Sequence, residues 1–387
     1  MIKNITDSIK YIGVDDRDID LFESQYVVPN GISYNSYLIM DEKVVLMDTV
    51  DKRAAKEWEE NLMEALEGKK VDYLVISHLE PDHAGSILRV LELFPEVTLV
   101  GNAKTFAMLP QFYDEMPEFN KITVAEGDKL GTGAHILNFI MAPMIHWPEV
   151  MVTFESSEGV LFSAEGFGKF GALDTDEDWA CEARRYYFNI VGKYGGPVQT
   201  LLKKAANLDI KIICPLHGPI LTENLSYYIG LYDTWSSYKP EKKGVLIAFA
   251  SIHGNTKKAA YKLADMLKEA GEEKVVVSDL AREDIAEVIE DAFKYDRMIV
   301  AASSYDGGVF PYMQDFLLHL KSKAYQNRTV GIVENGSWGP TAAKVMKEIL
   351  STLKDVRILD ETVTIRSTLK ESNMPAMEAL VNSIRNV

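Results

Sequence analysis

The C-terminal part of the chain alternates short apolar runs with stretches of helical periodicity. The apolar runs cover residues 244–250, 274–279, 297–302, 329–334 and 362–366. The helical stretches cover residues 255–270, 283–295, 311–323 and 340–353, with a last one from 371. Parallel strands need crossover connections and become buried on both faces. The pattern therefore predicts a doubly wound, five-stranded parallel sheet with helices on its two faces.

The N-terminal part has more apolar runs for its length and fewer helical stretches. The runs cover residues 36–40, 43–49, 72–77, 98–101, 135–142, 150–154, 160–164 and 210–214. Helical periodicity is found at residues 51–67, 84–94, 103–114 and 197–207. Clusters of strands broken by helices predict a mixed or two-sheet α/β layer structure. The polar segment 234–244 separates the two patterns, so we expect one domain over residues 1–240 and another over 244–387.

Composition and charge narrow the class of protein. The chain has 387 residues, of which 47% are hydrophobic and 26% charged, as in a folded globular protein of two or three domains. The formal net charge of -17 argues against nucleic acid and anionic membranes as partners. Up to residue 240 there are 21 basic and 37 acidic residues, against 20 and 21 after it. The acidic excess therefore lies in the first domain.

The N-terminal segment, the lengths of the apolar runs and the two cysteines indicate where in the cell the protein is expected. The first residues lack the apolar block of a signal peptide, and no apolar run reaches the roughly 18 residues of a membrane span. Cys181 and Cys214 form no C-x-x-C motif, so a disulfide framework, a zinc ribbon and a rubredoxin-type iron centre are unsupported. We expect a cytoplasmic protein that contacts neither a membrane nor nucleic acid.

Four candidate metal ligands follow the apolar run at 72–77 within six residues. They are His78, Glu80, Asp82 and His83. We expect Pro81 to stop the segment from continuing as regular strand or helix, so that these side chains gather around one point. A single histidine in such a place is most often structural, but four ligand types together favour a metal site.

Three more apolar runs are followed by a candidate ligand. The residues concerned are His146, Glu165 and His217. Functional residues gather where strands end and loops begin, so we expect these side chains to join the first four. Glu165 could instead cap a turn before Gly166. For His135, within a predicted strand, and His319, within a predicted amphipathic helix, we favour structural roles.

The loops after three strands of the second domain are rich in hydroxyl groups and glycine. They comprise Ser251, Ile252, His253, Gly254, Asn255 and Thr256; then Ser303, Ser304, Tyr305, Asp306, Gly307 and Gly308; and then Asn335, Gly336, Ser337, Trp338 and Gly339. The first loop opens a helix, whose unpaired N–H groups and dipole favour a phosphate. There is no G-x-G-x-x-G motif and no Walker lysine, so dinucleotide and P-loop sites are weak readings. Ordinary strand-to-helix turns remain the alternative for the first loop taken alone.

The two motif sets resemble those of flavodiiron proteins, also called A-type flavoproteins. The H-x-E-x-D-H motif with its later histidine, acidic residue and histidine is similar to their version of the metallo-β-lactamase superfamily. Hydrolases of that superfamily usually have histidine at the place of Glu80, and a carboxylate suits iron better than zinc. The resemblance implies a metallo-β-lactamase-like αββα sandwich followed by a flavodoxin-like domain.

The resemblance also implies a ligand assignment for two non-haem iron ions. His78, Glu80 and His146 would hold one iron, Asp82, His83 and His217 the other, and Glu165 would bridge them. The family usually has aspartate at the bridging position, so Glu165 is a departure. Tyr194 matches a tyrosine near the diiron pocket, where its hydroxyl would hydrogen-bond a bound diatomic molecule. The three loops resemble the FMN site at the switch point of flavodoxins, although relatives often have proline at the place of Ser303.

The implied activity is the reduction of dioxygen to water or of nitric oxide to nitrous oxide, a detoxification reaction. FMN would receive electrons from an external donor, rubredoxin or a reduced deazaflavin, because one flavodoxin module ends the chain. Relatives form head-to-tail homodimers, so we expect such a dimer or a dimer of dimers. Two alternatives stay open: a metal-dependent hydrolase with an appended flavodoxin domain, and an electron-transfer protein whose first domain has lost its metal.

Overall fold

The computed structural model describes residues 2–387 and divides into two compact units. The first comprises the chain up to Tyr187 together with Gly196–Asp233, and the second comprises Phe188–Gly195 and Thr234–Val387. The polar segment 234–244 is partly ordered into regular structure, since helix α7 (Leu225–Ser236) ends in it and strand β17 (Lys242–Ala250) begins in it. Within this segment Trp235 is buried, and its indole N–H donates to Glu241 Oε2 at 2.9 Å.

The first unit contains two stacked sheets. The seven-stranded sheet runs in the order β1 (Lys3–Asn4), β2 (Ile9–Tyr11), β7 (Tyr37–Ile39), β8 (Val45–Met47), β9 (Tyr73–Val75), β10 (Thr98–Asn102) and β11 (Asn120–Val124). The five-stranded sheet runs in the order β12 (Lys129–Gly131), β13 (Ile136–Met141), β14 (Met151–Glu155), β15 (Val160–Phe162) and β16 (Ile212–Cys214). Two short ladders stand apart: β3 (Val14–Asp16) with β6 (Ile32–Tyr34), and β4 (Leu21–Phe22) with β5 (Tyr26–Val27).

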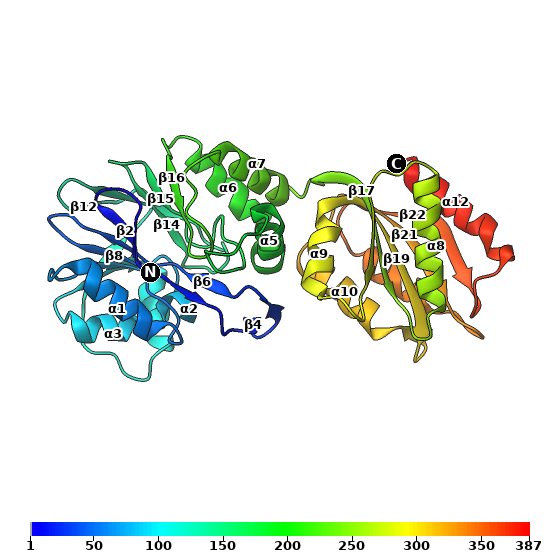
Figure 1. Ribbon diagram of the computed structural model, residues 1–387, viewed down its shortest axis with the longest axis horizontal. Helices are drawn as coiled ribbons and strands as arrows, with labels where there is room; N and C mark the ends of the chain where they lie inside the picture. Colours follow the sequence, from blue (N-terminus) through cyan, green and yellow to red (C-terminus); the bar gives the residue numbers. More distant parts are fainter. Residues whose placement is uncertain (1) are drawn as a thin grey trace. The chain divides into compact units, whose positions relative to one another are not determined.

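Helices cover both outer faces of this pair of sheets. The helices of this unit are α1 (Ala55–Leu66), α2 (Pro81–Ala84), α3 (Ile87–Leu93), α4 (Ala103–Met108), α5 (Trp179–Tyr186), α6 (Gly195–Ala205) and α7. In Figure 1, α1 and α3 lie on one side of the strands, and α6 and α7 lie on the other. The core is formed by the inner faces of both sheets, for example by Val75 and Phe139, which are fully buried. The predicted αββα layer structure is therefore confirmed.

The prediction for Pro81 is wrong, because this residue begins helix α2 and does not prevent regular structure. Proline is tolerated in the first helical turn, where its fixed φ suits a helix and its missing N–H would be unpaired anyway. The result is a single helical turn that carries Asp82 and His83 while Glu80 immediately precedes it. Four candidate ligands are thus held by the end of a strand and one helical turn.

The second unit is a doubly wound sheet in the order β18 (Val275–Asp279), β17, β19 (Tyr295–Tyr305), β21 (Arg328–Asn335) and β22 (Val356–Ile365). All neighbouring strands in this order are parallel, which confirms the predicted flavodoxin-like domain. A short strand, β20 (Gly308–Val309), pairs antiparallel with the end of β19. The helices are α8 (Asn255–Glu269), α9 (Ile285–Lys294), α10 (Pro311–Ser322), α11 (Ala342–Leu350) and α12 (Met374–Arg385).

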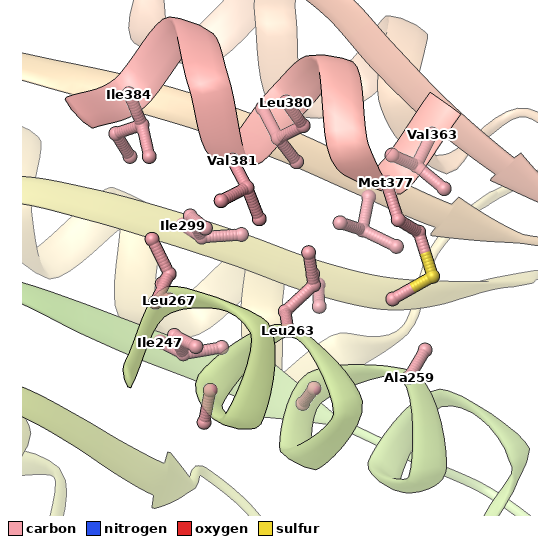
Figure 2. Packing of buried hydrophobic residues seen from close by; sticks show 14 of the residues in the cluster. Ile247, Ala259, Leu263, Leu267, Ile299, Val363, Met377, Leu380, Val381 and Ile384 are labelled. Atoms are coloured by element: carbon pink, nitrogen blue, oxygen red, sulfur yellow. The ribbon is translucent and has the colours of Figure 1, made fainter. Parts of the chain in front are cut away.

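Helices α8 and α12 cover one face of this sheet, and α9 and α10 lie on the other side (Figure 1). Figure 2 shows Leu263 of α8 and Leu380 of α12 pointing into one apolar layer together with Ile299 of β19. All three side chains are fully buried. Burying a leucine or isoleucine side chain contributes roughly 1.5–3 kcal/mol. This layer fixes α8, and therefore the loop before it, against the sheet.

Within residues 2–387, no helix has both the length and the apolar character needed to cross a membrane.

Candidate functional site

The seven candidate metal ligands come from the ends of strands in both sheets of the first unit. Two sets of donor atoms are each within 4.8 Å of one another: those of His78, Glu80 and His146, and those of Asp82, His83 and His217. These are the two triads that the sequence resemblance implied. The strands β9, β13, β15 and β16 all end next to the loops that carry ligands, which explains how residues so distant in sequence meet.

The first triad is centred on a carboxylate oxygen. Glu80 Oε2 lies 3.2 Å from His78 Nε2 and 2.9 Å from His146 Nε2. Contacts with both imidazoles hold the pKa of Glu80 below its usual value, although burial opposes this by favouring the neutral acid. Trp147 packs edge-on against the His78 ring, with 5.0 Å between ring centroids. It therefore acts as an apolar wall beside this triad.

The second triad places two imidazole nitrogens face to face. His83 Nε2 and His217 Nε2 are 3.0 Å apart, and both lie near Asp82 Oδ2, at 3.3 Å and 3.2 Å. Glu165 joins this group, with Oε1 at 3.2 Å from His83 Nε2. Its Oε2 is 3.9 Å from His217 Nε2.

The donor atoms around the second triad fit a metal centre. Both carboxylate oxygens of Asp82, and Oε1 of Glu165, are buried without a hydrogen-bond partner. Buried polar atoms normally have partners, and several unpaired acceptors around facing imidazoles are costly unless a cation satisfies them. Three histidine or carboxylate donors for each of two ions, plus Glu165, form a nitrogen and oxygen set that suits iron.

The outer nitrogens of two ligand histidines are held by neighbouring acceptors. His78 Nδ1 lies 2.8 Å from Glu149 Oε1, which also accepts the N–H of Leu79 at 2.9 Å. His217 Nδ1 lies 2.7 Å from the carbonyl oxygen of Ser33. When Nδ1–H donates outward, the lone pair of Nε2 points to the site. Glu149 and Ser33 therefore orient two candidate ligands, and neither was expected from the sequence.

These contacts determine the protonation of His217 and Glu165 in the metal-free protein. Burial lowers the affinity of His217 for a proton, but the close carboxylate of Asp82 and the charge of Glu165 outweigh it and raise the pKa of His217 to about 9. Burial also opposes ionisation of Glu165, yet its contacts with His83 and the other imidazoles hold its pKa well below the usual value. Binding of metal ions must therefore displace protons from the imidazoles.

A tyrosine hydroxyl contacts the second ligand group, and it belongs to Tyr186. The hydroxyl at the end of α5 donates to Glu165 Oε2. Tyr194, which the resemblance placed near the metals, lies in a 3-10 turn (Gly192–Tyr194) of the second compact unit. Its ring is half-buried and lies under Lys193 Nζ at 5.0 Å. A catalytic role for Tyr194 stays a prediction, and Tyr186 is the tyrosine that touches a candidate ligand.

A cavity of about 410 Å³ gives access from solvent to two of the candidate ligands. Its lining includes Glu80 and Asp82, the tip of the β4–β5 hairpin with Glu23, and the side chains of Tyr34 and Arg53. Although Glu23 is exposed to solvent, partial desolvation at the cavity, followed by the charge of Glu80, raises the pKa of its carboxyl group to about 7. A small molecule can therefore approach the carboxylate ligands past a group that holds a proton near neutral pH.

The second unit contains a separate cavity of about 550 Å³ at the ends of β17, β19 and β21. Fifteen predicted loop residues line it together with two residues that the sequence reasoning missed: Ser251, Ile252, His253, Asn255, Thr256, Ser303, Ser304, Tyr305, Asp306, Gly307, Asn335, Gly336, Ser337, Trp338 and Gly339, then Thr341 and Ser367. Gly254 and Gly308, also predicted, do not line the cavity but shape its loops. The sequence thus located nearly the whole lining.

The loop before α8 fits a phosphate. Helix α8 begins without a side-chain cap, so its first N–H groups are available to an anion. Gly254, with φ of +84°, turns the chain into the helix. Thr256 Oγ1 lies 3.0 Å from Ser303 Oγ, which joins the first two loops. The Trp338 side chain is 94% exposed, an uncommon state for a large aromatic ring and one that suits stacking on a planar ligand.

Comparison with known proteins gives the family. The chain matches the model described as "ODP family beta lactamase" over residues 32–218 and the model described as "Flavodoxin domain" over residues 246–367. It is 31% identical over 373 residues to the nitric oxide reductase of Moorella thermoacetica, an alignment covering 94% of this chain and 92% of that protein. A mutant of the flavo di-iron protein from Thermotoga maritima superposes with a TM-score of 0.90 at 26% identity, over 100% of this chain and 98% of that one.

The chain belongs to the flavodiiron protein family. The rubredoxin oxygen:oxidoreductase of Desulfovibrio gigas has the same fold, with a TM-score of 0.93 at 24% identity, over 100% of this chain and 98% of that one. The resemblance stated from the motifs is therefore confirmed. Within this flavodiiron chain, the bridging role of Glu165 stays a prediction, because its carboxylate contacts His83 and His217 of one triad.

Proposed function

We propose that this flavodiiron protein is an oxidoreductase that reduces dioxygen to water or nitric oxide to nitrous oxide. Two iron ions would be held by the two triads and Glu165, and FMN by the loops at the ends of β17, β19 and β21. When bound, the irons supply redox-active binding of the diatomic gas, and FMN supplies electrons one at a time. The observation that carries the proposal is the set of seven converging donors, with buried, unpaired carboxylate oxygens, on a chain that also has a flavodoxin cavity.

The reaction requires protons as well as electrons. Dioxygen takes four electrons and four protons to give two waters, whereas two nitric oxide molecules take two of each to give nitrous oxide and one water. Tyr186 holds a proton beside Glu165, because burial and then the charge of that carboxylate raise the pKa of its hydroxyl far above the usual value. Glu23 holds one at the cavity that leads to Glu80. Glu23 is therefore placed to supply a proton to the ligand set, whereas the Tyr186 hydroxyl keeps its proton and holds Glu165 in position.

The chain's own contacts keep the ligands in position during turnover. Glu149 and the carbonyl group of Ser33 fix the rings of His78 and His217. Phe22 packs edge-on against the His217 ring, with 5.3 Å between ring centroids, and Trp147 does the same for His78. These apolar rings limit the access of water to the imidazoles. The ligands are therefore preorganised and partly shielded before any gas arrives.

Electron supply completes the proposal. We infer that the FMN receives electrons from rubredoxin or a reduced deazaflavin. We also infer a head-to-tail homodimer, or a dimer of dimers, because electron transfer needs a flavin close to the irons. Size measurement by light scattering tests the dimer. Turnover with each donor in turn tests the source of electrons.

The experiment that tests the activity is anaerobic reduction of the iron- and FMN-loaded protein, followed by rapid mixing with dioxygen or nitric oxide. We expect flavin reoxidation by at least one gas to be much faster in the loaded protein than in protein from which only the iron has been removed. Nitrous oxide should accumulate if nitric oxide is the substrate. Equal reoxidation with and without iron, for both gases, would contradict the proposal.

A further inference from the structure

A second cluster of potential ligands lies at the other end of strand β13. His135 immediately precedes β13, Glu155 is the last residue of β14, and Glu158 lies in the turn to β15. Their donor atoms are all within 4.8 Å of one another. His146 follows the opposite end of β13, and six residues at about 3.3 Å each place the two clusters roughly 20 Å apart. This cluster is therefore separate from the proposed diiron centre.

The strand register brings the three side chains together. Leu137 of β13 is opposite Glu155 of β14, and His135 lies two residues before Leu137. Side chains alternate between the faces of a sheet, so His135 and Glu155 share one face as diagonal neighbours. His135 Nδ1 is 3.3 Å from Glu155 Oε1. The tight turn after β14 then returns Glu158 to the same place.

Backbone and hydroxyl donors hold both carboxylates in place. Glu155 accepts the N–H groups of Ser157 at 2.7 Å and Glu158 at 2.8 Å, one on each oxygen. Glu158 Oε2 accepts the hydroxyl of Thr6 at 2.6 Å, which ties the N-terminal segment to the turn. Ordered carboxylates with outer hydrogen bonds are typical of metal ligands. Longer contacts come from the Ser8 hydroxyl, at 3.4 Å from both Glu158 oxygens, and from the Ile136 N–H, at 3.5 Å from Glu155 Oε1.

The balance of charge at the cluster is incomplete. His135 is 4% exposed and Glu155 is fully buried, yet His135 Nδ1 has no hydrogen-bond partner. In the part of the chain that the structure describes, no lysine or arginine forms an ion pair with Glu155 or Glu158. A third carboxylate, that of Asp41, accepts the backbone N–H of His135 at 3.0 Å. The carboxylate of Glu155, which is buried without a cation, is therefore costly, and the imidazole nitrogen without a hydrogen bond adds to that cost.

We propose that His135, Glu155 and Glu158 bind a divalent transition metal ion of the zinc class. One imidazole nitrogen and two carboxylate oxygens are the donors that Zn²⁺ accepts in proteins, whereas Ca²⁺ and Mg²⁺ prefer oxygen alone. An ion of charge +2 would satisfy the orphan nitrogen and offset both glutamates. Three protein donors leave a further position for water. The ion would clamp β13, the β14–β15 turn and, through Thr6, the N-terminal segment, so its role is structural.

The test uses the full chain loaded with iron and FMN. Zn²⁺ is titrated in by calorimetry, and iron and zinc are then counted by elemental analysis. The variants are Glu158→Gln, which keeps an acceptor for Thr6, and His135→Gln. Glu96→Gln is the matched control, because that glutamate is 92% exposed in its side chain and lies outside the cluster. If His135→Gln fails to fold, the Glu158→Gln variant alone tests the zinc site, because Glu158 is only half-buried and its substitution should be tolerated.

We expect the parent protein and Glu96→Gln to take up one zinc per chain without losing iron. Glu158→Gln and His135→Gln should bind that zinc at least about tenfold more weakly. Zinc should also raise the melting temperature of the parent but not of these two variants, and gas reduction should be unchanged in Glu158→Gln. No additional zinc in the parent, equal uptake by all four proteins, or binding of Ca²⁺ or Mg²⁺ in place of zinc would overturn the proposal.

Discussion

The hydroxyl of Tyr186 donates a hydrogen bond to Glu165 Oε2, and both side chains are almost completely buried. Glutamate at position 165 is one methylene longer than the aspartate usual in the family, so its carboxylate has more freedom to rotate. The tyrosine hydroxyl removes part of that freedom by fixing one oxygen. The other oxygen is then directed to His83, at 3.2 Å.

Replacing Tyr186 by phenylalanine should therefore disturb the ligand set without emptying it. A hydrogen bond to a charged group contributes about 1.5–3 kcal/mol, so we expect gas reduction to fall by about tenfold to one hundredfold in Tyr186→Phe. Iron content should stay near that of the parent. Stopped-flow reoxidation and elemental analysis measure the two quantities.

Tyr194→Phe is the matched control for this comparison, since Tyr194 is the tyrosine that the sequence motif suggested. We expect its reoxidation rate to remain within about twofold of the parent, because within residues 2–387 the contact seen for its side chain is that of its ring with Lys193. A large loss in Tyr194→Phe with none in Tyr186→Phe would show that the motif assignment is right and that the Tyr186 hydroxyl does not position Glu165 for turnover.

Glu149 orients His78, so its removal should weaken the first triad. We expect Glu149→Gln to lower iron affinity by about tenfold to one hundredfold, because a neutral amide is a weaker acceptor for the imidazole N–H. Anaerobic equilibrium dialysis against a chelator measures this loss. Unchanged affinity in Glu149→Gln would mean that His78 is positioned without it.

Alanine variants of Gly254 and Gly271 distinguish the effect of backbone strain on stability from an effect on binding of the flavin phosphate. Gly254 and Gly271 have φ of +84° and +92°, and an added methyl group meets nothing closer than 3.8 Å at either. Alanine at each should cost about 1–2 kcal/mol of stability because of its left-handed backbone. Only Gly254→Ala, next to the start of α8, should also weaken FMN binding, by about tenfold or more. Flavin fluorescence titration and thermal unfolding measure both effects; equal FMN affinity in the two variants would place the phosphate elsewhere.

The raised pKa of His217 predicts how metal binding depends on pH. In metal-free protein this pKa is about 9, above the usual value of about 6.5 for the unfolded chain. The protonated ring therefore stabilises the metal-free fold fully below about pH 6.5, and this stabilisation is lost as the pH rises through 9. A metal ion must displace that proton. Anaerobic Fe²⁺ affinity should therefore rise about tenfold per pH unit between 7 and 9 on account of this group.

His217→Asn provides the control for that measurement, because it removes one titrating ligand. The Fe²⁺ affinity of this variant should be lower at every pH. The number of protons released per iron bound, which sets the slope of affinity against pH, should be smaller by about one. A parent protein whose affinity is flat between pH 7 and 9 would show that the ligand histidines are already neutral without metal.

The sequence predicted the fold in both halves because hydrophobic periodicity is strong there. The five parallel strands of the second unit lie where the apolar runs are, and the loops after β17, β19 and β21 meet at one cavity because parallel strands end at the same edge. Helices α5 and α7 were missed. The segment of α5 is short and rich in charged residues, and the segment of α7 is apolar on most sides with only a weak amphipathic pattern.

The convergence of the candidate ligands was predictable, whereas the groups that hold their side chains were not. His78 and Glu80 stand out because several ligand types crowd into a few residues after a strand. Glu149 and Tyr186 carry no such signal, since each reaches its ligand through folding of distant segments. The prediction that Pro81 prevents regular structure failed for a different reason, because proline is tolerated at the start of a helix. The bridging role of Glu165, the homodimer, the electron donor and the cytoplasmic location stay predictions.

The measurement that tests the central claim most directly is the iron, zinc and FMN content of the full chain purified without oxygen. The Glu158→Gln variant is measured beside the parent, so that zinc bound at the His135 cluster is not mistaken for zinc at the proposed diiron centre. We predict about two irons and one FMN per chain in both proteins, with loss of iron but not of FMN in a Glu80→Ala, Asp82→Ala double variant. Zinc in place of iron in both proteins, with or without flavin, would contradict the account and favour a metal-dependent hydrolase.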